Sequence, residues 1–356
     1  MGLPVQHLSR LIYRSIQATT QGVGAGLDWL LGVADFSGSV NRMSSPEREA
    51  WLSILNGVVG DHLSGTNNPL AIPISLRYRG QPLALISESL RRDCPDARCK
   101  LLITAHGLCL NDRHWSPAAN GAAANGATAC GPGLPDQLAA ELGYSAIHLY
   151  YNTGRHIGDN GSDFAALLEQ LVAQWPQPVD ELILLGHSMG GLVARSAVLE
   201  GAAAGHDWAR RPLQVICLGT PHQGAPLEQL GQQLDRMLEI SRYSAPFARL
   251  GRIRSAGISD LGHGRLRPDV QENSSQWPQA VPIHNIAGLL HDPARKTLSE
   301  TLGDGLVPLP SALNQPSNRK RCDEPVAGHQ YIAGNTGHLS LLTSPQVREV
   351  IRQWLS

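Results

Sequence analysis

Apolar and polar positions change their spacing several times along the chain, and this spacing separates strand-like from helix-like segments. Short apolar runs typical of strands occupy residues 71–78, 100–107, 145–151, 181–188, 213–221 and 281–288. Segments with apolar residues at helical spacing lie between them, at residues 136–143, 163–175 and 191–205. Strands that alternate with helices predict an α/β fold, in which helices flank a mostly parallel central sheet. Functional loops then lie beyond the carboxyl ends of the strands.

The first 65 residues carry helical patterns and no strand signal. Leu8, Leu11, Ile12 and Ile16 fall on one helical face. A second helix is predicted from Ser44, because Ser44 and Glu47 form a capping-box pattern ahead of an apolar face made of Trp51, Leu52, Leu55, Val58 and Val59. We therefore expect an N-terminal helical extension over residues 1–65, dispensable for chemistry, and a main domain over residues 66–356. The first helix is expected to dock on its own domain; contact with a membrane surface or a homodimer through these helices is the alternative.

Two stretches interrupt the alternation of strands and helices. Residues 117–133 are rich in Gly, Ala and Asn and predict a mobile loop. Residues 222–280 are far longer than an ordinary connection between strands. They contain a helix-like part at residues 229–240 and a part from Ser255 onward that we expect to be a loop. We interpret this second stretch as a cap or lid inserted over the functional face.

Charge and hydropathy exclude several classes of partner. The net charge of −1 gives no global attraction to nucleic acid. The chain has no run approaching the ~18 apolar residues that a membrane span requires. Polar residues interrupt the first apolar stretch, unlike a secretory signal: His7, Arg10, Arg14 and Gln17. We therefore expect a soluble, cytoplasmic protein; association with a membrane through the N-terminal helices is the alternative.

The cysteine spacing does not indicate a metal or redox motif. None of the six cysteines belongs to a CxxC pair. We expect isolated thiols; the alternative is a bridge between Cys94 and Cys99 across a short loop. No metal site is predicted.

The segment ELILLGHSMGGLVARS, residues 181–196, combines an apolar run, a glycine-rich turn and a helical pattern. Its centre, Gly186 to Gly190, has the form G-x-S-x-G, in which a serine is held on a sharp turn between a strand and a helix. The glycines leave room for a backbone that doubles back on itself. The context therefore predicts that Ser188 is a nucleophile at a helix N-terminus, where free N–H groups favour negative charge.

A serine nucleophile needs a base, and in this type of fold the chain order is serine, acid, histidine. His338 precedes the final helical stretch at residues 344–355, where the base is expected. His329, its rival, lies in the apparent last strand and is interpreted as structural. The candidate acids are Asp292, Asp304 and Asp323. Asp304 is our choice because small glycines flank it in a loop expected at the carboxyl edge of the sheet, while Asp292 remains the alternative.

An oxyanion hole would need two backbone N–H donors. The residue after the nucleophile, Met189, is expected to provide one. The loop after residues 100–107 begins with His106-Gly107 and is expected to provide the other from Leu108, with Cys109 as the neighbouring alternative.

Several motifs together resemble the α/β-hydrolase superfamily in its lipase and esterase branch: HGL, GHSMGG, TPHQGAP, GDGLVP and GHL, at residues 106–108, 186–191, 220–226, 303–308 and 337–339. They are most similar to bacterial lipase-like proteins and to the catalytic domain of GPI inositol-deacylases, over about residues 70 to 356. The resemblance implies an α/β-hydrolase fold with an inserted cap, no cofactor, and hydrolysis of a small-molecule or lipid carboxylic ester through an acyl-enzyme. The alternatives are an acyltransferase with the same triad and a non-catalytic binding protein of the same fold.

Overall fold

A computed structural model describes residues 45–116, 131–226, 255–266, 277–278, 280–292, 303–315 and 327–356. The chain divides into two compact units, residues 1–49 and 50–356, and the second unit contains the fold described below. In the described ranges, no helix combines the length and hydropathy needed to cross a membrane.

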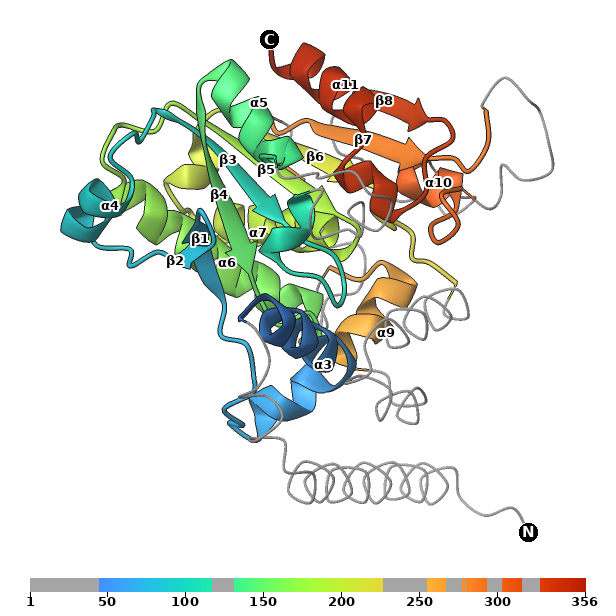
Figure 1. Ribbon diagram of the computed structural model, residues 1–356, viewed down its shortest axis with the longest axis horizontal. Coiled ribbons are helices and arrows are strands. Elements are labelled where there is room, and N and C mark those ends of the chain that lie inside the picture. Colours follow the sequence, from blue (N-terminus) through green and yellow to red (C-terminus); the bar gives the residue numbers. More distant parts are fainter. Residues whose placement is uncertain are drawn as a thin grey trace. The chain divides into compact units, whose positions relative to one another are not determined.

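An eight-stranded sheet forms the centre of the larger unit, in the order β2-β1-β4-β3-β5-β6-β7-β8 (Figure 1). The strands β1 and β2 form an antiparallel hairpin, β1 is antiparallel to β4, and all other neighbours are parallel. The strand bounds are β1 Ser75–Tyr78, β2 Gln81–Pro82, β3 Lys100–Ala105, β4 Tyr144–Tyr150, β5 Glu181–His187, β6 Leu213–Leu218, β7 Ile283–Gly288 and β8 Ala327–Ala333. Each of the predicted strand segments overlaps one of these strands, and only β4 begins before its segment, by one residue.

Helices cover both faces of the sheet (Figure 1). Their bounds are α3 Ser45–Gly65, α4 Ser87–Asp93, α5 Leu134–Leu142, α6 Ile157–Gln174, α7 Met189–Ala204, α9 Ala256–His263, α10 Leu309–Ala312 and α11 Pro345–Leu355. Short 3-10 helices occupy η1 Asp112–Trp115, η4 Trp208–Arg210 and η7 Leu339–Leu342. Side chains of a strand alternate between faces, so Leu101 and Ile103 of β3 join the core under α6 and α7, while Leu102 joins the core under α5 and α11.

The mostly parallel sheet with helices on both faces confirms the predicted α/β-hydrolase fold. Two segments differ from the sequence-based expectation. Residues 256–263, expected to be loop, form α9, which Ser255 caps by accepting a hydrogen bond from the amide of Ile258. Helix α6 begins at Ile157, earlier than predicted. Gly161 in its first turns lets it approach α7, since a Cβ there would overlap Ser196. The predicted helix at 229–240 and nearly all of the predicted loop at 117–133 lie outside the described residues.

Helix α3 is part of the core of the larger unit. The side chains of Trp51, Leu55, Val58 and Val59, predicted to share one face, are all buried. The side chain of Asn56 also fixes the chain that leads into β1. Its Nδ2 donates to the carbonyl of Leu70, and its Oδ1 accepts from the backbone amide of Ile72. The larger compact unit begins at Ala50. Residue 65, where the sequence places the domain limit, is the last residue of α3, and that limit stays a prediction.

Candidate active site

Ser188 occupies a strained turn between β5 and α7. Its backbone angles are φ 53° and ψ −122°, a sparsely populated combination that costs of order 1–3 kcal/mol and recurs at functional sites. The surrounding glycines make this turn sterically possible. A Cβ on Gly186 would overlap the backbone of Gly191, and a Cβ on Gly190 would overlap the carbonyl of Ala105.

The backbone around Ser188 is anchored to the neighbouring strand and helix. The amide of Ser188 donates to the carbonyl of Leu218 at the end of β6 (2.8 Å), and the carbonyl of Ser188 accepts from the amide of Gly191 (3.1 Å). Helix α7 runs for 16 residues from this point, so its positive end faces the serine. The turn is therefore fixed on both sides and is suited to stabilise negative charge near Ser188.

Asp304 and His338 form a buried pair. Nδ1 of His338 lies 2.7 Å from Oδ2 of Asp304, and the two side chains are 6% and 0% exposed. The other carboxylate oxygen accepts from the amides of Leu306 (3.0 Å) and Val307 (2.8 Å). Because an ionised carboxylate only accepts hydrogen bonds, Nδ1 of His338 carries the proton and Nε2 carries the lone pair. The imidazole is thus held in the tautomer that a general base requires.

Gly219, which follows β6, leaves room for the side chains of Asp304 and His338 because it has no side chain of its own. It has a positive φ of 55°. A Cβ there would lie 2.9 Å from Oδ2 of Asp304 and 3.0 Å from Nδ1 of His338. Since the preceding residue, Leu218, accepts the amide of Ser188, the end of β6 touches both the serine turn and the Asp304–His338 pair.

The competing candidates lie elsewhere or outside the described residues. His329 stands in β8, where its ring stacks on His284 and Trp354 at centroid distances of 5.1 and 5.4 Å. The carbonyl of Asp292 accepts from Nδ1 of His291, whereas the carboxylate bound to His338 is that of Asp304. Asp323 is outside the described residues.

His187 connects the serine turn to His338. Its Nε2 donates to the backbone carbonyl of His338 (3.1 Å), and the two rings are 4.7 Å apart. Burial is the main cause that lowers the pKa of His187 well below its ordinary value, so the ring is neutral. In the sequence His187 occupies a variable position of the G-x-S-x-G motif, and its place directly before the serine is the only local signal of this role.

The loop after β3 lies against the serine. A Cβ on Gly107 would lie 3.0 Å from Nδ1 of His187 and 3.2 Å from Cβ of Ser188. The amide of Cys109 donates to Oγ1 of Thr153 (3.2 Å), so this amide already has an acceptor and Leu108 is the better candidate donor. Met189 is the first residue of α7, and the first amides of a helix have no acceptor within it.

His106 stabilises the start of the same loop. Its Nδ1 donates to the carbonyl of Gly107 (3.0 Å), and its ring stacks on Tyr151 at 4.4 Å. The hydroxyl of Tyr151 donates to the carbonyl of His106 (2.7 Å). Burial lowers the pKa of His106 to about 3. The ring is therefore a neutral structural group and not a second base.

A further buried network was not anticipated from the sequence. The guanidinium of Arg195 on α7 donates to Nδ1 of His222 (2.7 Å), and Nε2 of His222 donates to Oδ1 of Asn285 on β7 (2.8 Å). This network joins α7 to the TPHQGAP loop and to β7. His222 in that loop is the local signal for this network. Its partners Arg195 and Asn285 are distant in sequence, so the sequence does not indicate them.

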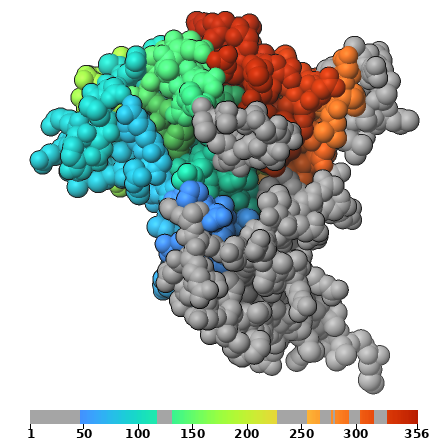
Figure 2. Space-filling model, viewed as in Figure 1, coloured from blue at the N-terminus to red at the C-terminus, as the bar shows by residue number. Residues whose placement is uncertain are grey.

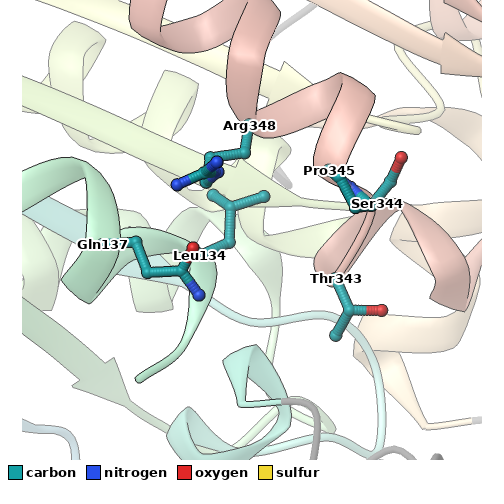
Figure 3. Close-up of a pocket in the computed structure, with 6 residues that line it drawn as sticks. All are labelled: Leu134, Gln137, Thr343, Ser344, Pro345 and Arg348. Carbon is teal, nitrogen blue, oxygen red and sulfur yellow. The ribbon is translucent and has the colours of Figure 1, made fainter. Parts of the chain in front are cut away.

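A surface cavity of about 140 Å³ lies apart from these residues, between α5 and the start of α11 (Figure 3). Its lining comes from Leu134, Gln137, Thr343, Ser344, Pro345 and Arg348. The guanidinium of Arg348 is paired with Glu141 of α5 (2.6 Å), and the two helices adjoin at the surface (Figure 2). The cavity includes none of Ser188, Asp304 and His338, so it is not a substrate site for them.

Comparisons with known proteins identify a family to which part of the chain is similar. Residues 154–286 match the family model of the PGAP1-like alpha/beta domain, which is just over a third of the chain. This match includes the serine turn, and it confirms the resemblance to the α/β-hydrolases inferred from the motifs. A search of curated proteins finds no match.

Similar solved structures include three bacterial and archaeal proteins. The mature form of a Bacillus licheniformis lipase has 18% identity and a TM-score of 0.47, covering 80% of this chain and 98% of its own. A Pyrococcus furiosus esterase has 14% identity and a TM-score of 0.41, covering 73% and 82%. A lipase-esterase related protein from Clostridium acetobutylicum has 13% identity and a TM-score of 0.41, covering 73% and 96%.

Proposed function

We propose that the chain is a serine hydrolase that cleaves carboxylic esters through an acyl-enzyme. Ser188 is the nucleophile, His338 the general base and Asp304 the residue that orients it. The observation that carries this proposal is the buried 2.7 Å contact between His338 and Asp304, at the strand edge that also holds the strained turn of Ser188.

The proton path follows from the tautomer of His338. Asp304 binds the proton on Nδ1, so Nε2 accepts the proton of Ser188 as its Oγ attacks the ester carbonyl. The carboxylate then stabilises the imidazolium. The backbone amides of Leu108 and Met189 bind the oxyanion of the tetrahedral intermediate.

The second half of the reaction uses the same groups in reverse. Nε2 of His338 protonates the leaving alcohol. The alcohol departs, and the acyl group remains bonded to Oγ of Ser188 as the acyl-enzyme. Water then loses a proton to Nε2, attacks the acyl carbonyl and releases the acid, with Ser188 regaining its proton. Ser188, His338 and water carry every proton in this sequence.

Apolar side chains beside the catalytic residues support an ester with an apolar group. Leu339 directly follows His338 and is 37% exposed, while Leu290 after β7 is 55% exposed. The methyl groups of Leu290 lie close to where Cβ atoms of Gly305 and Gly337 would stand, and these glycines are adjacent to Asp304 and His338. These two leucines would offer an apolar contact to the acyl or alcohol part of an ester bound beside Ser188.

The test combines covalent labelling with turnover. A fluorophosphonate should label Ser188 in the wild-type protein and leave Ser188→Ala unlabelled, with the adduct located by peptide mass spectrometry. A series of p-nitrophenyl esters of increasing chain length, with and without a dispersed lipid interface, measures chain preference and any contact with a membrane surface. Transfer of the acyl group to an added alcohol in preference to water would indicate an acyltransferase. Absence of both labelling and turnover in folded protein would instead favour a non-catalytic binding protein.

A further inference from the structure

Helix α3 packs without clearance against the loop that carries the candidate oxyanion donor. The buried Gly57 faces Cys109, where a Cβ on Gly57 would overlap Sγ and lie 3.3 Å from both Cα and Cβ. The thiol of Cys109 also points toward the carbonyl of Ile54 on the same helix (3.9 Å). Because Cys109 follows Leu108 directly, a displacement of the Cys109 backbone would shift the peptide unit that bears the Leu108 amide.

Cys109 is itself in a backbone conformation that leaves little freedom. Its φ is 60°, in the left-handed region that costs a non-glycine residue energy. It is held there by the bond from its amide to Oγ1 of Thr153 and by burial, since it is 2% exposed. A strained conformation of this kind persists only where its surroundings determine it.

The same helix also holds the loop that contains Thr153. The side-chain amide of Asn152 donates to the carbonyl of Gly60 (2.8 Å), and a Cβ on Gly60 would overlap that side chain. Oδ1 of Asn152 in turn accepts from the amide of Gly154 (3.0 Å). Thus α3 contacts Cys109 directly through Gly57. It also acts on Cys109 indirectly, through the loop whose Thr153 accepts the hydrogen bond of the Cys109 amide.

The irregular part of α3 lies between these two glycines. Val59 has non-helical angles of φ −134° and ψ 17°. The carbonyl of Gly57 accepts from the hydroxyl of Ser255 (2.7 Å), at the start of α9. The amide of Ala256 donates to Asp61 (2.9 Å). The irregular residue of α3 thus lies in the part of the helix that contacts the loop of Cys109, the loop of Asn152 and the start of α9.

We infer that α3 is a positioning element of the oxyanion site, in which Gly57 sets the place of the Leu108 amide relative to Ser188 through Cys109. This inference rests on the proposed ester hydrolysis and gives α3 a role in it. An oxyanion donor contributes about 10²–10³-fold to kcat, and a misplacement of about 1 Å can cost about 10²-fold. Ordinary core packing would instead affect stability and leave kcat unchanged.

The first experiment compares two identical substitutions in the same helix. Gly57→Ala should lower kcat on a short soluble ester by about 10²-fold with KM within about twofold, because the transition state loses a donor that the ground state does not need. Gly65→Ala is the matched control, since a Cβ there would have no neighbour within 4 Å. Equal kcat values for the two variants would overturn the inference.

A double-variant cycle tests whether the effect passes through Cys109. In the Cys109→Ala background the overlap with Sγ is gone, so adding Gly57→Ala should cost at least tenfold less in kcat than it does in the wild type. An undiminished cost in that background would exclude Cys109 as the route.

Two further variants, at Thr153, test the role of Cys109 in placing the Leu108 amide if Gly57→Ala does not fold. Thr153→Val removes the acceptor of the Cys109 amide and should lower kcat about tenfold at unchanged KM, whereas Thr153→Ser keeps the hydroxyl and should restore kcat to within threefold of the wild type. Equal kcat for Thr153→Val and Thr153→Ser would overturn the inference while wild-type turnover upholds the proposed function. A wild type without turnover or labelling at Ser188 would overturn the proposed function, and the inference with it.

Discussion

His187 donates a hydrogen bond from Nε2 to the backbone carbonyl of His338, across 3.1 Å. The residue before the candidate nucleophile is thereby attached to the backbone of the candidate base, which is far away in sequence. Since the pKa of His187 is held well below its ordinary value, mainly by burial, this donor keeps the same protonation state throughout the neutral range.

The first prediction follows from this bond. His187→Phe keeps a planar ring but removes the donor, so the backbone of His338 loses one partner. A hydrogen bond contributes about 0.5–1.5 kcal/mol net, and we expect kcat to fall by up to about tenfold with little change in KM. Steady-state kinetics on a soluble ester measures this. His187→Gln retains an N–H donor and should lie closer to the wild type; equal losses in both variants would refute a role for the bond.

The second prediction concerns the nucleophile. Ser188→Ala should remove ester turnover, with a loss on the order of 10⁶-fold in kcat, as found when a triad serine is removed. The substitution also leaves an alanine at φ 53°, so circular dichroism must first show that the fold is retained. Ordinary turnover by the folded variant would end the hydrolase proposal at this site.

The third prediction separates the two candidate acids. Asp304→Asn should lower kcat by about 10⁴-fold, because an amide no longer selects the tautomer of His338. Asp292→Asn serves as the control and should retain most of the turnover. The reverse result would move the orienting role to Asp292 and leave the serine mechanism in place.

The sequence allowed the sheet and the candidate chemistry to be predicted because both have local signals. Apolar runs of strand length mark β3 to β7, and the strand–turn–helix pattern marks Ser188. Asp304 and His338 could be selected by chain order and by their position in loops near the end of the chain. The contact between them forms only when the sheet folds. Each residue could nevertheless be selected separately, because glycines lie beside it in the sequence.

The supporting contacts could not be predicted in this way. The bond from His187 to His338 and the approach of Gly57 to Cys109 join segments that are distant in sequence. Helix α9 is a different case, since its signals were present: Ser255 at its start and Gly264, with a positive φ of 64°, at its end. The loop-like composition of the surrounding stretch masks these two helix signals.

The fourth prediction concerns stability in acid. Burial is the main cause that lowers the pKa of His284 from 6.5 to about 4. Its Nδ1 accepts from the amide of His329 and its Nε2 donates to Gln214, so the ring must be neutral. In the unfolded chain it binds a proton near pH 6.5, so its contribution is complete above that pH and is lost as the pH falls to about 4.

The variant His284→Gln removes this titration. Thermal midpoints of the wild type and the variant should differ by a constant amount above pH 6.5, and the gap should narrow between pH 6.5 and about 4, as the wild type loses the contribution. Differential scanning fluorimetry over that range measures it. Curves that stay parallel down to pH 4 would contradict the assigned cause.

The fifth prediction revises the expectation that residues 1–65 are dispensable. A chain that begins at Asn67 lacks α3 and exposes the surface that Trp51, Leu55, Val58 and Val59 cover. Burying one such side chain contributes roughly 1.5–3 kcal/mol, and their sum is comparable with the whole net stability of a domain, about 5–15 kcal/mol. We therefore expect this chain to be unfolded or inactive, whereas a chain that begins at Ser45 keeps α3 and should retain its cooperative unfolding and its kcat. Circular dichroism melts and ester kinetics on both chains decide this. Full activity from the chain that begins at Asn67 would show that α3 contributes neither to the core nor to the oxyanion site.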